Sequence, residues 1–197
     1  NAYSSGKHMV SGEEWISLSA IKDAGSYFVD YPEYDLRAYP FSIDYNKDGF
    51  MDLVVGSIDG YFYYYRGEKM GDNYETSGPI KLTNPDGENI SVQGHSAPVM
   101  ADVNGDGVID LISGSSDGNI YWFSGNGDLT FNSRGILIKT GISGQVMPAI
   151  GDINGDGITD LVVGSNEKTI KFYYGSKNNG DLSFITAPNI RIEGLEN

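Results

Sequence analysis

Three short stretches of the chain carry closely spaced aspartates and asparagines whose oxygen atoms could bind a cation. The clearest stretch runs from Asp102 to Leu111, with acidic or amide side chains at loop positions 1, 3, 5 and 9. Gly107 at position 6 permits the sharp bend that lets such side chains converge. Hard oxygen ligands at this density suit calcium, with the backbone carbonyl at position 7 and water completing the shell.

The same pattern begins again at Asp44 and at Asp152. One cluster of this kind is also typical of an ordinary turn, but three copies in one register favour calcium. Magnesium suits the pattern less well, because it demands tight octahedral geometry and keeps its waters. The sequence therefore predicts three Ca²⁺ sites, with these ligands: Asp44, Asn46, Asp48, Phe50 and Asp52; Asp102, Asn104, Asp106, Val108 and Asp110; Asp152, Asn154, Asp156, Ile158 and Asp160.

The twelfth loop position separates these loops from EF-hand or dockerin-type loops, which begin with the same alternating oxygens. An EF-hand closes its shell with a bidentate glutamate at that position. This chain has Val55, Ser113 and Val163 there, and none of them supplies a carboxylate. Short apolar and β-branched runs follow the last aspartate of each loop, which is typical of buried strands. Each loop is therefore expected to join two strands.

The similarity extends beyond the loops to a whole repeating unit. A proline precedes each first aspartate by four residues. Glycines follow each last aspartate by four and by fifteen residues, and an aromatic residue follows it by twelve. A further glycine, eight residues after the last aspartate, is replaced by Lys168 in the third copy. The repeated positions are Pro40, Pro98 and Pro148; Gly56, Gly114 and Gly164; Gly60 and Gly118; Tyr64, Trp122 and Phe172; Gly67, Gly125 and Gly175.

One unit predicts four strands, at residues 98–101, 111–114, 119–124 and 135–139. Four antiparallel strands in about fifty residues are typical of a β-propeller blade, which makes the fold class all-β. The first two loops lie 58 residues apart and the next two 50 apart. We place the extra length in the polar stretches Glu68–Gly78 and Thr83–Gly94, where insertions cost least.

These spacings divide the chain into four predicted segments. Residues 1–37 form a leader in which Glu14–Ser19 alternates like the last strand of a preceding blade. The blade repeats then cover residues 38–94, 95–144 and 145–197.

The repeated unit resembles the FG-GAP repeats of integrin α-subunit propellers and their bacterial relatives, the VCBS-type repeats, over about residues 38–194. The resemblance implies a calcium-bearing β-propeller with its metal loops on one rim, used mainly for adhesion or for ligand and sugar recognition. The departures are Lys168, Tyr45 and Phe50. The two aromatic residues lie at non-ligand or carbonyl positions and should not impair the site.

Three blades cannot close a ring, because propellers have four to eight. We expect this chain to be part of a larger propeller, completed by other blades of the same protein. Self-association of copies to complete a ring is an alternative. A short open solenoid is another, although it would expose sheet faces and invite aggregation.

Composition excludes several classes of partner. The formal charge of −14 disfavours binding to nucleic acid or to an anionic membrane surface. No apolar run approaches the ~18 residues needed to cross a bilayer. The loops hold nine acidic side chains, so three Ca²⁺ ions would bring the formal charge to −8. Calcium loops outside the EF-hand frame favour the extracellular side, where calcium is millimolar, so we expect a secreted or cell-surface protein.

The remaining chemistry-bearing residues favour packing over catalysis. The chain has no cysteine, and neither His8 nor His95 belongs to a recognisable nucleophile motif. A distant pair of carboxylates for glycoside hydrolysis is not excluded by sequence. Aromatic residues 61–65, 121–123 and 172–174 could stack on sugar rings, with Trp122 and Tyr64 as first candidates. Aromatics are favoured in strands, however, and we expect core packing.

Two functional hypotheses follow. The first is a non-catalytic, calcium-binding recognition or adhesion module whose ligand is a protein or a polysaccharide at a cell surface. The alternative is an accessory or scaffold part of a secreted polysaccharide-degrading enzyme.

Overall fold

The computed structural model describes residues 10–11, 14–15, 38–70, 73–178 and 181–187, and these are all-β. The predicted strand at Glu14–Ser19 lies mostly outside them. Within the described part of that segment, β2 (Glu14–Trp15) pairs with β1 (Val10–Ser11) in a short antiparallel hairpin.

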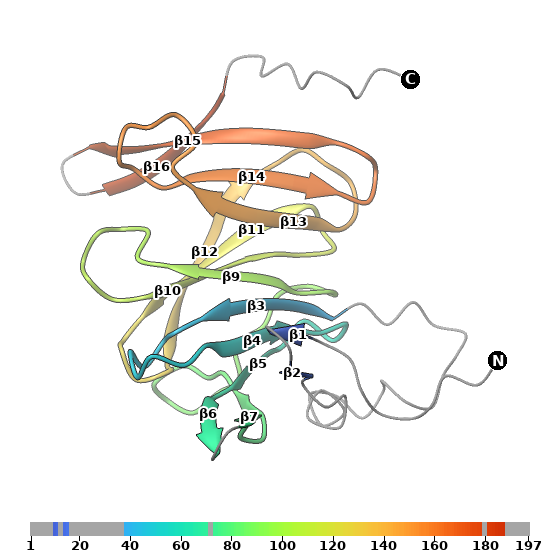
Figure 1. Cartoon of the computed structure of the whole chain (residues 1–197). Coiled ribbons are helices and arrows are strands. Elements are labelled where there is room, and N and C mark those ends of the chain that lie inside the picture. Colours follow the sequence, from blue (N-terminus) through green and yellow to red (C-terminus); the bar gives the residue numbers. More distant parts are fainter. Residues whose placement is uncertain (1–9, 12–13, 16–37, 71–72, 179–180, 188–197) are drawn as a thin grey trace.

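Three four-stranded antiparallel sheets follow one another along the chain, one in each predicted repeat (Figure 1). The first contains β3 (Tyr39–Ile43), β4 (Asp52–Gly56), β5 (Phe62–Tyr65) and β8 (Ile80–Lys81). The second contains β9 (Ala97–Ala101), β10 (Asp110–Gly114), β11 (Asn119–Gly125) and β12 (Phe131–Lys139). The third contains β13 (Val146–Gly151), β14 (Asp160–Ser165), β15 (Ile170–Asn178) and β16 (Asp181–Thr186).

The strand order is sequential in each sheet, as in a propeller blade. The first strands of consecutive sheets, β3, β9 and β13, lie next to each other, and the sheets stack face to face (Figure 1). Each predicted loop joins the first strand of its blade to the second, as the strand bounds show. All three loops therefore occupy the same place in their blades.

The fourth strands differ from the prediction in two ways. In the second blade, β12 begins at Phe131 and not at 135, and it stays paired with β11 by bulging between Ser133 and Gly135. Gly135 has a φ of +82°, which the sequence pattern did not indicate. In the first blade, the polar insertion forms a separate hairpin of β6 (Gly67–Met70) and β7 (Asn73–Thr76), leaving a fourth strand of two residues.

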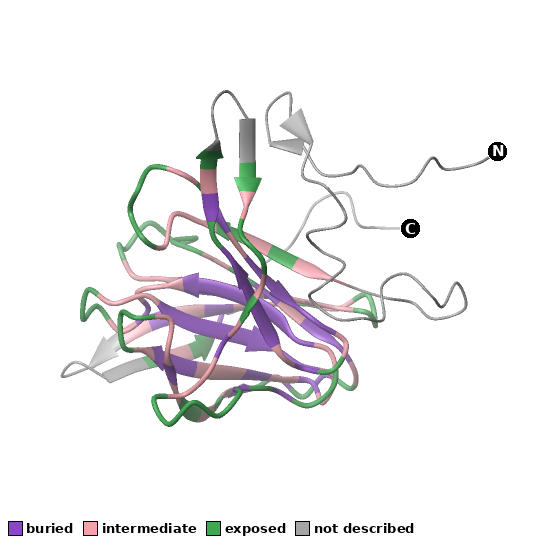
Figure 2. Ribbon diagram, turned by 90° about the horizontal axis from the view of Figure 1, so that it is seen from below, coloured by how far each residue is buried: buried purple, intermediate pink, exposed green. Residues whose placement is uncertain are grey.

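The core lies between blades (Figure 2). Val54 and Tyr64 of the first blade lie in one buried apolar cluster with Leu111 and Phe123 of the second. Ile112 of the second blade lies in another buried apolar cluster with residues of the third. A fully buried Leu, Val, Ile or Phe contributes about 1.5–3 kcal/mol. The aromatic residues of the first two runs, and Tyr173 of the third, lie in or against these clusters, which confirms for them the prediction of core packing. Tyr64 and Trp122 face the following blade, while Tyr63, Tyr65, Tyr121 and Phe123 face the other way.

Backbone hydrogen bonds repeat at both described blade junctions. The Ser96 N–H donates to the Ser57 carbonyl at 3.0 Å, and the Val146 N–H donates to the Ser115 carbonyl at 3.1 Å. At this point the chains approach so closely that a Cβ on Gly114 would lie 2.0 Å from the Val146 carbonyl oxygen. Two of the repeated glycines, Gly56 and Gly114, are thus explained by contact with the next blade.

Candidate metal centres

The side chains at positions 1, 3 and 5 gather at the tip of every loop. In the second loop, Asp102 Oδ1 and Asn104 Oδ1 both accept from the Asp106 N–H, at 3.1 and 2.9 Å. The Asn104 amide then donates to Asp106 Oδ2 at 2.8 Å. Gly107, with a φ of +87°, donates its N–H to Asp102 Oδ2 at 2.9 Å.

The same contacts recur in the other two loops within 0.1 Å. The structure therefore brings nine of the predicted ligand residues together, two carboxylates and one amide at each tip, and their role as metal ligands stays a prediction. They are Asp44, Asn46 and Asp48; Asp102, Asn104 and Asp106; Asp152, Asn154 and Asp156.

The residues at position 7 close the tip through their backbone. Each donates its N–H to the position 5 carboxylate, at 2.8–2.9 Å. In the second loop this bond, together with the Asn104 amide, lowers the pKa of Asp106. The tip is therefore built for an ionised carboxylate. The three residues are Phe50, Val108 and Ile158, and a ligand role for their carbonyl groups stays a prediction.

The aspartates at position 9 lie at the base of the loops and not at the tips. Asp52, Asp110 and Asp160 are fully buried. One oxygen of each accepts the N–H of the residue at position 2. The other accepts the N–H of the glycine fifteen residues onward, which follows β5 by two residues in the first blade and lies in β11 and β15 in the other two. These glycine contacts, from Gly67, Gly125 and Gly175, measure 2.8, 2.9 and 2.8 Å.

This arrangement explains the repeated glycine at that place. A Cβ on Gly125 would lie 2.0 Å from the Ile109 carbonyl, the residue before Asp110. The aspartate and the glycine therefore form one contact that ties the end of the loop to the third strand. Sequence reasoning assigned the aspartate as a ligand only and missed this structural role, although the constant spacing of fifteen residues was its signal.

The aromatic residue twelve positions after the aspartate supports the buried carboxylate. The Tyr64 hydroxyl interacts with Asp52, and burial followed by this interaction raises the pKa of Tyr64. Burial also raises the pKa of Asp110, against the lowering effect of backbone N–H groups and a weak contact with the Trp122 indole. That contact is weak because the buried Nε1 has no partner in full hydrogen-bonding geometry. The third blade has Phe172 there, and Asp160 instead accepts a further N–H from Asn154 at 3.2 Å.

The donor set at each tip suits a hard divalent cation. Each carboxylate oxygen that accepts one N–H retains a second lone pair, and so does the amide oxygen. Within the described part of the chain, no three Asp, Glu, His or Cys side chains form one metal-binding group. The reason is that position 3 is asparagine and the position 9 carboxylate faces inward, so each tip offers two carboxylates and an amide.

A polar cavity of about 500 Å³ lies where the first blade's second insertion meets the second blade. The insertion turns at Gly87, and Asn84 fixes the turn by accepting the N–H groups of Asp86 and Glu88 at 3.0 and 2.8 Å. Its Nδ2 donates to Glu88 at 2.9 Å. The side chains around the cavity are mostly amides, carboxylates and hydroxyls: Asn84, Pro85, Asp86, Glu88, Asn89, Ile90, Ser91, Phe123, Asn132 and Ser133.

Comparison with protein families agrees with the repeat seen in the fold. A model of FG-GAP-like repeats matches residues 44–113 and 102–163, and a model of the FG-GAP repeat matches residues 148–183. The chain belongs to the FG-GAP repeat family. No curated protein and no solved structure matches the chain significantly.

The matched FG-GAP segments begin at or just before loop aspartates and reach into the sheets that follow. The expected FG-GAP resemblance and the all-β, blade-like fold class are therefore confirmed. Among the residues that the structure describes, none forms a helix long and apolar enough to cross a membrane.

Proposed function

We propose that this chain is a non-catalytic β-propeller module that binds Ca²⁺ at its three loops and recognises an extracellular ligand. The observation that supports it most is the repetition itself. Three loops of different sequence, including Tyr-Asn-Lys in one and Val-Asn-Gly in another, fold into the same hydrogen-bonded tip at the same strand junction. Oxygen donors from carboxylates, amides and backbone carbonyls are the ligands that Ca²⁺ takes in proteins.

In this proposal Ca²⁺ supplies positive charge to a surface that is rich in carboxylates. The side chains at positions 1 and 5 and the amide at position 3 would hold the ion. The position 9 carboxylate ties the loop base to the third strand, so binding at the tip is coupled to blade packing. A free Ca²⁺ concentration of one to ten times the dissociation constant adds about 0.4–1.4 kcal/mol per site to the free energy of unfolding. Three sites matter against a total stability of about 5–15 kcal/mol.

The ligand is a protein or a polysaccharide at a cell surface. The cavity beside the Asn84 turn supports a hydroxyl-rich ligand, because amides and carboxylates can pair with several hydroxyl groups at once. Millimolar calcium outside cells would keep sites of modest affinity filled, which supports a secreted or cell-surface location. We also propose that further blades, from the same protein or from another copy, pack on the third sheet, where Ile170 and Ile185 are 46% and 59% exposed.

Isothermal titration with CaCl₂ tests the metal part of the proposal. Wild type should bind close to three ions, and Asp102→Ala should bind one fewer while keeping its far-ultraviolet circular dichroism. A glycan array, read with calcium and with chelator, tests recognition. Absence of heat with calcium would refute the calcium proposal, and an array without calcium-dependent binding would leave a protein ligand as the remaining class.

A further inference from the structure

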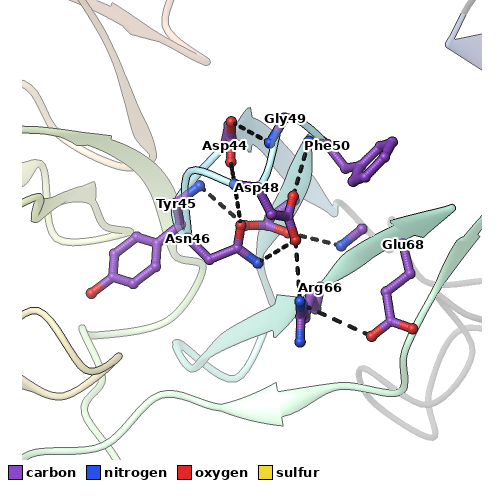
Figure 3. A network of polar contacts seen from close by, with 10 residues as sticks. Asp44, Tyr45, Asn46, Asp48, Gly49, Phe50, Arg66 and Glu68 are labelled. Atoms are coloured by element: carbon purple, nitrogen blue, oxygen red, sulfur yellow. Dashed lines mark hydrogen bonds and ion pairs between the residues drawn. The ribbon is translucent and has the colours of Figure 1, made fainter.

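The first loop differs from the other two because a cation already contacts it. Arg66, the residue after β5, places a guanidinium nitrogen 3.2 Å from Asp48 Oδ2, the position 5 carboxylate (Figure 3). Its Nε lies 3.9 Å from Glu68 on the other side. An arginine guanidinium is charged at any physiological pH.

The corresponding places in the other blades carry no charge. Arg66 follows the last loop aspartate by fourteen residues, and the residues at that spacing in the second and third blades are Ser124 and Tyr174. Among the described residues, no ion pair is formed by any carboxylate of those two loops.

A second difference lies inside the first loop. Position 4 is Lys47, in the left-handed region with a φ of +59°, where the other loops have Gly105 and Gly155. Those glycines donate their N–H groups to the position 1 aspartate at 2.6 and 2.7 Å. In the first loop, Asp44 accepts from positions 5 and 6 only, within the described residues. The first tip is therefore less negative and less firmly held.

We propose that Arg66 acts as a built-in competitor of the metal and makes the first loop the weakest of three graded calcium sites, the last to fill. This inference rests on the proposed calcium function. A divalent ion bound at Asp48 must displace the guanidinium or lie beside it, and like charges repel. The second and third loops fill first and support the packed blades, while the first loop responds to higher calcium concentrations.

The expected effect is modest, because the ion pair is at the surface. Side-chain exposure is 51% for Arg66 and 27% for Asp48. Exposed pairs of this kind contribute little, so we expect a change of roughly two- to fivefold in a binding constant. The effect should shrink as salt is raised, since ions screen exposed charges over about 10 Å at 0.1 M.

A calcium titration followed by ¹H–¹⁵N NMR resolves the three loops in one sample. The amides of Gly49, Gly107 and Gly157 report on them individually, because each donates to the position 1 aspartate of its own loop. In wild type, Gly49 should reach its midpoint at the highest calcium concentration. Arg66→Gln should bring that midpoint roughly two- to fivefold lower at low salt, with the Gly107 and Gly157 midpoints unchanged.

Arg134→Gln is the matched control, because it removes the same charge from the second blade. Arg134 is exposed and its Nε donates to Ser124 Oγ at 2.9 Å, with no ion pair among the described residues. It should leave the Gly49 midpoint unchanged. Equal wild-type midpoints for the three glycines, or a Gly49 midpoint that Arg66→Gln fails to lower, would overturn the role of Arg66 and leave the calcium proposal standing. No calcium-dependent shift in any loop would refute the calcium proposal itself.

Discussion

Replacement of Gly114 by alanine tests the stacking of the blades against a control that the repeat itself provides. Gly114 ends the second strand of the second blade, and Gly164 has the same place in the third. A Cβ on Gly114 would lie 2.0 Å from the Val146 carbonyl oxygen and 3.0 Å from the Pro148 ring. A Cβ on Gly164 would meet nothing closer than the Met147 carbonyl oxygen, at 3.9 Å.

The expected loss of stability follows from the steric overlap between the new Cβ and the Val146 carbonyl oxygen. A backbone carbonyl group cannot shift as easily as the end of a flexible side chain. The third blade must therefore move away from the methyl group that Gly114→Ala introduces. Overpacking of this kind costs about 1–3 kcal/mol. Weakening the Val146 to Ser115 backbone hydrogen bond costs about 0.5–1.5 kcal/mol more. The reduced entropy of the unfolded chain returns about 0.4–1 kcal/mol. We expect Gly114→Ala to lower the free energy of unfolding by about 1–4 kcal/mol.

Gly164→Ala should be neutral or stabilising by up to about 1 kcal/mol, because only the unfolded-state entropy changes. Urea unfolding of the three proteins, followed by circular dichroism at equal calcium, measures the differences. For a chain of this size each kcal/mol corresponds to about 2–4 °C in Tm. Equal stabilities of the two alanine variants would refute the packing of the third blade on the second.

Three further predictions concern single residues. Asp110→Asn should lower the free energy of unfolding by about 1–3 kcal/mol, because it leaves a buried N–H without an acceptor, as urea unfolding in chelator would show. The backbone N–H of Val108 lowers the pKa of Asp106. The contribution of the Asp106 carboxylate to folding stability is therefore complete above the ordinary pKa of about 3.9 and is lost as pH falls through the lower pKa of the folded protein. Asp106→Asn should therefore weaken the loss of stability in acid, measured by unfolding between about pH 2 and 6. Lys168→Gly should stabilise by about 0.5–1 kcal/mol, since Lys168 has a φ of +59° where Gly118 has +80°.

The pH dependence of stability that Asp110 contributes has the opposite direction to that from Asp106, so the two variants check each other. Burial raises the pKa of Asp110 in the folded protein. Its contribution favours the fold below the ordinary carboxyl pKa and is lost as pH rises through the raised folded value. The two variants should therefore change the acid limb of the stability curve in opposite directions.

The sequence predicted most of the blade because local chemistry decides it. Turn residues such as Gly107 and alternating aspartates fix the loop, and β-branched runs fix the strands on either side. The repeat then sets the order of the sheets. The loop tips were predictable for the same reason, since the contacts that the loop residues at positions 1 to 7 make with one another join residues at most five positions apart.

The rest depends on contacts between residues distant in the chain. The bond of Asp110 to Gly125, fifteen residues away, gives the carboxylate a structural role that no local pattern indicates, while its role as a metal ligand stays a prediction. Arg66 and Asp48 are separated by 18 residues and no local pattern links them. The fourth strand of the second blade begins early because Gly135 allows a bulge, and bulges depend on the partner strand as much as on local sequence.

A crystal structure of the protein grown with saturating CaCl₂ tests the central claim most directly. We predict an ion at each loop tip, 2.3–2.6 Å from side-chain oxygens at positions 1, 3 and 5, the range for Ca²⁺, with the blades stacked as described. Loop tips that hold only water at saturating calcium, or ions at the 2.0–2.1 Å typical of Mg²⁺, would contradict it.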